Sequence, residues 1–340
     1  MGGRGPSRQA KVQRPARGGK SPSDRERRSR ASGDDAVRYR RAPAPRRRLG
    51  RLGITASDSA LSPGARRGSP EPEPAGLVRA AYPILEFDPD RRALIEPSSH
   101  LCAPSREEID VPARAVACFF GDVVARIARD RGSRQVAQLY SEHGVHPIFE
   151  LEHRGEPVAF FQPGVGAPLA SFFIEEAIDY GCRAIIACGG AGALDDDLAL
   201  GHPVVVSAAV RDQGTSYHYL PPSRLIEASP AIVAAVETVL KRAGVPFATG
   251  TTWSTDAVYR ETREKVSLRR AEGCITVEME AAALLAVARF RGVGLGQILY
   301  AGDSRAGEVW DHRDWVHAHN AREALFWLAM DAAVEMPMAL

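Results

Sequence analysis

The sequence lacks any apolar run near the ~18 residues of a membrane-spanning helix, and it has no secretory signal with an apolar core. Its five cysteines are odd in number and scattered, with no C-x-x-C pair. Neither a zinc site nor a disulfide framework is therefore predicted, and no metal is expected. Cys118 and Cys188 lie inside apolar runs and are expected in the core. These absences favour a reducing, cytoplasmic location and exclude a membrane partner.

Methionine is also scarce, since the next one after Met1 is Met279. Residues 1–78 hold 19 lysines and arginines against 7 acids; because the whole chain is +2, residues 79–340 carry −10. The segment 1–78 is rich in Arg, Gly, Pro and Ser, so we expect disorder. The favoured interpretation is a non-functional extension, with a true start at a non-Met codon near Val78. Nucleic-acid contact and a targeting role are the alternatives.

From residue 115 onward, strand-like and helix-like segments alternate. The run 115–120 reads as a buried strand, and a hairpin is expected around residues 154–156. Ser229, Pro230 and Gly244 delimit a helix as N-cap, first helical residue and C-cap. Further helices are expected at 279–291 and at about 321–334. This alternation predicts one α/β domain over residues 79–338, with helices on both faces of a sheet.

Three glycine or acid clusters follow predicted strands: Gly121-Asp122, Gly189 to Gly192, and Gly302-Asp303. In α/β folds, ligands gather at the loops that leave the carboxyl ends of strands. Glycine allows close backbone approach, and consecutive N–H groups can bind an anion. No Gly-Lys-Ser/Thr follows these glycines, so a Walker loop is excluded.

Taken together and in order, several motifs resemble those of the nucleoside phosphorylase family, which includes uridine phosphorylase, hexameric purine nucleoside phosphorylase and the methylthioadenosine/adenosylhomocysteine nucleosidases. They are "FFGDVVARIA", "IIACGGAGAL", "STDAVY", "VEMEAAALLAVAR" and "YAGDS", within residues 85–335. The resemblance implies a three-layer αβα sandwich with a central mixed sheet. It also implies a homo-oligomer, because the family shares pocket residues across a dimer interface.

The resemblance assigns catalytic roles to Glu280 and Asp303. It implies that Glu280 binds the ribose hydroxyls and that Met279 lines the sugar pocket. A fixed carboxylate there would stabilise an oxocarbenium-like sugar. Asp303 falls where purine-cleaving branches carry the acid that serves N7 of the base, a role that needs a raised pKa. Glu278 is expected to contact the substrate, and the alternative is a role at the helix start alone. For Asp303 the alternative is a residue of a surface turn.

The base site resembles the purine-cleaving branches. Thr262 and Glu264 stand where uridine phosphorylases carry a Gln and an Arg that read uracil. The motif "WDHRDW" (310–315) is expected to form a lid or cap. Arg305 or Arg313 is expected to adjust the acidity of Asp303 there. The other expected substrate contacts are Val258 and Tyr259 at the base, His218 and Tyr219 at the ribose rim, Gly192, and Trp253 unless it is core.

The phosphate site departs from the family. Ala125, Ala187 and the region of Gly144 stand where phosphorylases carry phosphate-binding arginines. Arg126 is one place off and is the nearest substitute, whereas Arg183 comes too early. The glycine loop, Gly189 and Gly190 included, is closer to that of the nucleosidases, whose water-activating Glu is also missing. The remaining expected members of the nucleophile loop are Gly121 and Asp122, the latter as a base or a turn residue.

The sequence thus predicts cleavage of the N-glycosidic bond of a nucleoside, with a purine favoured and a role in purine salvage. Phosphorolysis to free base and ribose 1-phosphate is the family default, with phosphate as co-substrate and no other cofactor. The alternatives are a phosphate-independent nucleosidase, a degenerate nucleoside-binding module, and nucleic-acid binding through residues 1–78.

Overall fold

The computed structural model describes residues 79–99 and 109–338, which all belong to one compact unit within Pro70–Leu340. The predictions for the basic segment 1–78 lie outside the described residues. Within the described ranges, no helix is both long enough and apolar enough to cross a membrane.

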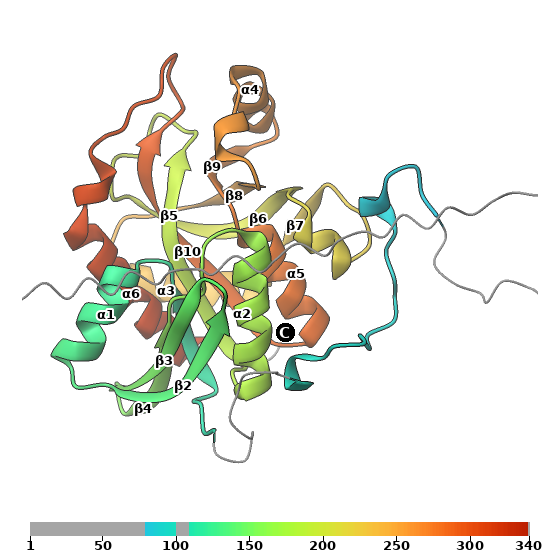
Figure 1. The fold of residues 1–340 in the computed structure, drawn as a ribbon. Coiled ribbons are helices and arrows are strands. Elements are labelled where there is room, and N and C mark those ends of the chain that lie inside the picture. Colours follow the sequence, from blue (N-terminus) through green and yellow to red (C-terminus); the bar gives the residue numbers. More distant parts are fainter. Residues whose placement is uncertain (1–78, 100–108, 339–340) are drawn as a thin grey trace, which may run out of the picture. The chain divides into compact units, whose positions relative to one another are not determined.

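The described residues form one mixed sheet of ten strands (Figure 1). The strand order is β10-β6-β8-β9-β5-β1-β4-β3-β2, with β7 beside β6. The strands are β1 (Arg114–Cys118), β2 (Arg134–Ser141), β3 (Gly144–His153), β4 (Glu156–Phe161), β5 (Ala184–Ala193), β6 (Pro203–Asp212), β7 (Leu225–Glu227), β8 (Ala248–Thr255), β9 (Cys274–Glu278) and β10 (Gly294–Ser304).

Five of these strands close into a ring, because β10 pairs with β5 on one side and with β6 on the other. The ring continues from β6 to β8, from β8 to β9, and from β9 back to β5. Strand β9 is antiparallel to β5 and meets it only at Gly192 and Ala193. The carboxyl ends of β5, β9 and β10 therefore converge on the glycine cluster.

Helices cover both faces of the sheet, as Figure 1 shows. One face packs against α2 (Ala167–Tyr180) and α5 (Ala281–Arg291). The other packs against α1 (Gly121–Asp130), α3 (Pro230–Arg242) and α6 (His319–Glu335). A further helix, α4 (Arg263–Ala271), lies against β9. The predicted α/β sandwich with a mixed sheet is confirmed.

Aromatic packing ties α6 to the sheet. Phe160 on β4 and Phe326 on α6 are fully buried and meet edge to face, with ring centroids 5.5 Å apart. Burying each such side chain contributes about 1.5–3 kcal/mol. Cys118 and Cys188 are fully buried as well, which confirms their expected place in the core.

Local sequence signals set several boundaries. The predicted hairpin is confirmed: Arg154 and Gly155 link β3 to β4 with φ values of +54° and +81°, as a tight hairpin turn requires. Helix α3 begins at Pro230 as predicted, but its C-cap is Ala243, and Gly244 follows with a φ of +67°. Helix α5 begins at Ala281, two residues later than predicted.

Short 3-10 helices fill connections near the converging strand ends. They are η1 (Pro83–Leu85), η2 (Pro97–Ser99), η4 (Thr215–His218), η5 (Val258–Arg260) and η6 (Trp315–His317). The predicted glycine loop is wrong in one respect, since β5 stays in strand pairing through Gly189 and Gly190 to Ala193. Pairing with Leu299 and Tyr300 of β10 holds these glycines in the strand.

Candidate active site

Gly192 lies where three strand ends meet. On one side it pairs with Val277, the residue before Glu278 at the end of β9. On the other side, the register of β10 against β5 shifts between Ala301 and Ser304. The intervening Asp303 therefore leaves the sheet in a bulge beside the glycine strand. Such bulges re-aim side chains at active sites.

Two donors hold the Asp303 carboxylate. Arg305 Nη1 donates to Asp303 Oδ2 over 2.8 Å, and Trp310 Nε1 donates to the same oxygen over 2.5 Å. Arg305 also forms an ion pair through Nε with Glu261, whose side chain is 6% exposed. Burial raises the pKa of Glu261, and the positive charge of Arg305 opposes that rise. One guanidinium therefore bridges two carboxylates.

Of the two arginines expected to act on Asp303, Arg305 is the one that contacts it. Arg313 instead donates to the carbonyl of Leu198 over 2.6 Å. Arg305 lies directly over Gly192, since its Nη1 would be only 1.9 Å from a Cβ at that position. The absence of a side chain at Gly192 leaves the space that Arg305 occupies.

Glu278 is buried and anchors the start of α5. Its Oε2 accepts hydrogen bonds from the backbone N–H groups of Glu280 and Ala281, over 2.7 and 2.6 Å. Its Oε1 accepts from the Ser254 hydroxyl, whose oxygen in turn accepts from the N–H of Ala282. This network satisfies helix N–H groups that would otherwise lack partners, so it fits the helix-start alternative for Glu278.

Glu280 joins the starts of two helices. It is the N-cap of α5, and its Oε1 accepts from the N–H of Gly166, the N-cap of α2, over 2.6 Å. Burial, with the charge of Glu278 second, raises the pKa of Glu280 to about 8. The charge of Asp256 adds to the rise. A buried carboxylate with a pKa this far from its ordinary value is typical of functional sites.

The predicted nucleophile loop forms the β1–α1 turn. Asp122 is half exposed and accepts from Arg322 Nη2 over 2.7 Å. Arg126 lies one turn further along α1 and pairs with Glu323 of α6. Gly189 and Gly190 lie beside this turn in β5, with Phe119 and Tyr300 against their backbones. The structure therefore places Arg126 in a contact between α1 and α6.

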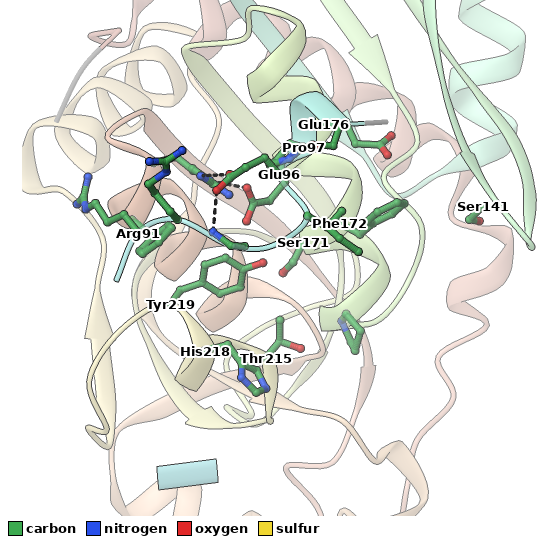
Figure 2. Close-up of a pocket in the computed structure, with 18 of the residues that line it drawn as sticks. Arg91, Glu96, Pro97, Ser141, Ser171, Phe172, Glu176, Thr215, His218 and Tyr219 are labelled. Atoms are coloured by element: carbon green, nitrogen blue, oxygen red, sulfur yellow. Dashed lines mark hydrogen bonds and ion pairs between the residues drawn. The ribbon is translucent and has the colours of Figure 1, made fainter. Parts of the chain in front are cut away.

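A cavity of about 1060 Å³ opens beside α2 and η4 (Figure 2). Its walls include Pro168, Gly214, His218, Tyr219 and Asp256. It reaches the Glu280 region, since Gly214 N–H donates to Asp256 and the charge of Asp256 acts on Glu280. His218 and Tyr219, predicted at the ribose rim, lie on the wall of this cavity.

The charged wall of this cavity is held by Arg291. Arg291 forms ion pairs with Glu175 of α2 and with Glu96 of the segment before η2. Arg91 from the same segment lies over the Phe290 ring, with its Cζ 5.3 Å from the centroid. Residues 88–99 therefore form one side of the cavity.

The remaining predicted contacts differ in exposure. Met279 is half buried beside Glu280, whereas Val258 and Tyr259 are exposed, Tyr259 at 96%. Trp253 is fully buried and donates from Nε1 to Asp212, so it belongs to the core. Thr262 is the N-cap of α4, accepting from the N–H of Lys265.

A second cavity, of about 800 Å³, lies beside the Asp303 cluster. Glu261, Arg305 and Trp310 line it, with Arg263 and Arg270 from α4. Among the described residues, no group of three or more His, Cys, Asp or Glu side chains is placed to hold a metal ion.

Sequence reasoning missed three residues of this site: Glu261, Trp310 and Arg322. Glu261 lies between the motif residues Val258 and Thr262, and its ion pair with Arg305 joins it to a distant part of the chain. Arg322 lies far along the chain from the β1–α1 turn that it contacts. Only the position of Trp310, seven residues after Asp303 in an aromatic cluster, carried a signal in the sequence.

The family model of the phosphorylase superfamily matches residues 113–329. The chain therefore belongs to this superfamily, and the resemblance of its motifs to nucleoside phosphorylases is confirmed.

Individual relatives include both purine and pyrimidine enzymes. A guanosine phosphorylase of Halorubrum lacusprofundi is 30% identical over 166 residues, which cover 48% of this chain and 67% of the relative. A uridine phosphorylase of Thermococcus kodakarensis is 28% identical over 207 residues, covering 53% of this chain and 73% of the relative. One relative is named for a purine nucleoside and the other for a pyrimidine nucleoside, so the two relatives do not decide the base.

Solved structures share the fold. A purine nucleoside phosphorylase from Toxoplasma gondii, in complex with immucillin-H, superposes with a TM-score of 0.59 at 22% identity, covering 68% of this chain and 92% of that chain. An AMP nucleosidase from Bacteroides thetaiotaomicron gives a TM-score of 0.54 at 23% identity, covering 66% of this chain and 87% of that chain. At these identities the likeness establishes the fold alone.

Proposed function

We propose that the protein cleaves the N-glycosidic bond of a purine nucleoside by phosphorolysis, giving the free base and ribose 1-phosphate. One observation carries the proposal: Gly192 pairs with Val277, three residues before Glu280, and lies beside the β10 register shift that contains Asp303. A carboxylate for the sugar and an acid for the base are the two groups that this chemistry needs.

The proposed reaction breaks the bond between C1′ of the ribose and N9 of the base, and the electron pair leaves with the base. Asp303 donates a proton or a hydrogen bond to N7, and an oxygen of phosphate forms the new bond to C1′. The sugar passes through an oxocarbenium-like state, which the Glu280 carboxylate stabilises. Because this step needs ionised Glu280, its raised pKa makes its protonation state part of the mechanism.

Support for a purine comes from the base side of the site. A purine presents N7 to Asp303, whereas uracil has no equivalent atom. Thr262 caps α4 and Glu264 is exposed, so neither takes the place of the uracil-reading Gln and Arg expected in uridine phosphorylases. We therefore favour purine salvage as the context.

We also propose a cytoplasmic homo-oligomer that shares its pockets. Phe172 of α2 and Tyr140 of β2 line the first cavity and are 44% and 46% exposed. A second copy would remove this apolar surface from water. Sedimentation of the full-length protein should give a mass above one chain, and a strictly monomeric active protein would contradict this part of the proposal.

Hydrolysis is the second candidate, because alanines stand at two positions where phosphorylases carry arginines. Ala187 is fully buried in β5, between β1 and β10. A nucleoside-binding module without catalysis is the third. The three differ in one measurable property, which is whether base release occurs and whether it requires phosphate.

The test measures base release by the full-length protein from a panel of purine and pyrimidine nucleosides, with and without phosphate. We expect release from purine nucleosides only when phosphate is present, and a loss of about 100-fold in kcat for Asp303→Asn. Release without phosphate would establish a hydrolase. Binding of nucleosides with no release under either condition would exclude an enzyme acting on these substrates.

A further inference from the structure

Arg126 and Arg183, the two arginines nearest to the positions of the missing phosphate-binding arginines, both have other partners. Arg126 pairs with Glu323. Arg183 donates from Nη1 to the carbonyls of Ile178 and Cys182, so its head group is held by backbone. Phosphorolysis by this chain therefore requires a cation from another element.

Arg322, in the first turn of α6, reaches the β1–α1 turn. Its side chain is 16% exposed, and its Cζ lies 4.7 Å from the centroid of the Phe120 ring. Phe120 is the residue before Gly121 and is the N-cap of α1. Helix α6 thus delivers a guanidinium to the turn that the sequence identified as the nucleophile loop.

A short chain of contacts connects Arg322 to the glycine strand. The Phe120 and Tyr300 rings are 5.7 Å apart, and Tyr300 packs against the backbone of Gly190. Burial raises the pKa of Tyr300, the positive charge of Arg322 opposes that rise, and the charges of Asp303 and Asp122 add to it. The charges of both Arg322 and Asp303 therefore act on Tyr300.

The hydrogen-bonding capacity of Arg322 is only partly used. Its Nη2 donates to Asp122, but its Nε is buried and has no hydrogen-bond partner among the described residues. Nε and Nη2 form the two-pronged edge with which arginine binds an oxyanion. Leaving a buried N–H unpaired is unfavourable, so an added acceptor there would stabilise this edge of Arg322.

The adjacent end of α1 also suits an anion. This ten-residue helix begins at Gly121, and no side chain caps its first N–H groups. Uncapped N–H groups and the helix dipole together favour negative charge at such an end. Asp122 supplies that charge in the present structure, and it has a second neighbour in His319, whose Nδ1 lies 3.8 Å from Asp122 Oδ2.

We propose that Arg322 binds the phosphate co-substrate and that Asp122 holds its place when phosphate is absent. Phosphate displaces the Asp122 carboxylate from Nη2 and takes Nε–H as its second donor, while Asp122 turns to His319. This inference rests on the proposed phosphorolysis. It assigns phosphate binding to Arg322 of α6, in place of the arginines that are missing at Ala125 and Ala187.

The kinetic test compares two substitutions with opposite expected effects. Arg322→Gln should raise the KM for phosphate about tenfold or more and leave the KM for nucleoside within about twofold. Asp122→Asn should lower the KM for phosphate, because it removes the competing charge. Arg129→Gln, on the exposed face of α1, is the matched control and should change neither KM. Arg322→Lys should fall in between, since it keeps the charge without the two-pronged edge.

A binding test does not depend on turnover. Inorganic phosphate should raise the Tm of the full-length protein, and Arg322→Gln should abolish that rise. The inference is overturned if phosphate fails to raise the Tm of the wild type, or if Arg322→Gln keeps the wild-type KM for phosphate. In the second case phosphate-dependent base release would continue, so the proposed function would stand without this residue.

Discussion

Arg305 occupies the space that a side chain on Gly192 would fill. Its Nη1 lies 1.9 Å, and its Cζ 2.8 Å, from the position of a Cβ on that glycine. The same Nη1 donates to Asp303 Oδ2. The lack of a side chain at Gly192 therefore determines whether Asp303 keeps its guanidinium partner.

Gly192→Ala should uncouple this pair. The added methyl cannot fit without moving Arg305 away from Asp303, so we expect kcat/KM to fall about tenfold to a hundredfold. The measurement is kcat/KM for Gly192→Ala, Arg305→Ala and the double variant.

The double variant is the control for this prediction. If Gly192→Ala acts through Arg305, the two losses will be strongly non-additive, because the second change removes an interaction already lost. Additive losses would show that Gly192 contacts the substrate independently of Arg305.

The sequence predicted the architecture well because its signals were local. Strands alternated with glycine-stopped helices, and Arg154-Gly155 marked a hairpin that the structure contains. The strand character of the glycine cluster was not predictable in this way. Gly189 and Gly190 have no strand preference of their own, and pairing with β10 holds them in the strand.

The site was predictable where a motif carries its own geometry and unpredictable where two distant elements meet. Glu278 and Glu280 come directly before a helix, so their place at its start followed from the sequence. Arg322 reaches Asp122 from 200 residues further along the chain. No spacing rule predicts a contact of that kind, because it depends on how α6 packs against α1.

Glu278→Gln should mainly reduce stability. Oε2 of the buried carboxylate accepts from two backbone N–H groups at the start of α5 and Oε1 accepts from the Ser254 hydroxyl, whereas glutamine keeps an acceptor oxygen at only one of these two positions. We expect the free energy of unfolding to fall by about 1–3 kcal/mol, measured by urea denaturation. A raised nucleoside KM with unchanged stability would instead support direct contact of Glu278 with substrate.

Trp253 and Trp310 form a matched pair, since each donates its Nε1–H to an aspartate. Trp253 is buried and donates to Asp212, whereas Trp310 is 61% exposed and donates to Asp303. Trp253→Phe should lower the free energy of unfolding by about 1–3 kcal/mol with kinetics preserved. Trp310→Phe should lower kcat with stability preserved. Reversal of this pattern would place Trp253 at the base.

Glu280 should make stability depend on pH, with a sign that follows from its raised pKa. The native protein keeps the proton on Glu280 up to about pH 8, whereas an unfolded chain releases it near 4.5. Between these values the native state binds more protons, so the free energy of unfolding falls as pH rises and levels off above about 8. Glu280→Gln should reduce this fall, because a neutral amide has no proton to lose.

Ionisation of Glu280 should also affect the kinetics. It should raise kcat/KM as pH increases, whereas it lowers the free energy of unfolding. If the ionised carboxylate stabilises the sugar, kcat/KM of the wild type will rise as pH increases toward about 8, since this parameter reports groups of the free enzyme. Glu280→Gln should have a low kcat/KM without that rise, while its amide oxygen still accepts from Gly166. A variant that keeps the wild-type rise would show that another group titrates and that Glu280 acts only in joining α2 to α5.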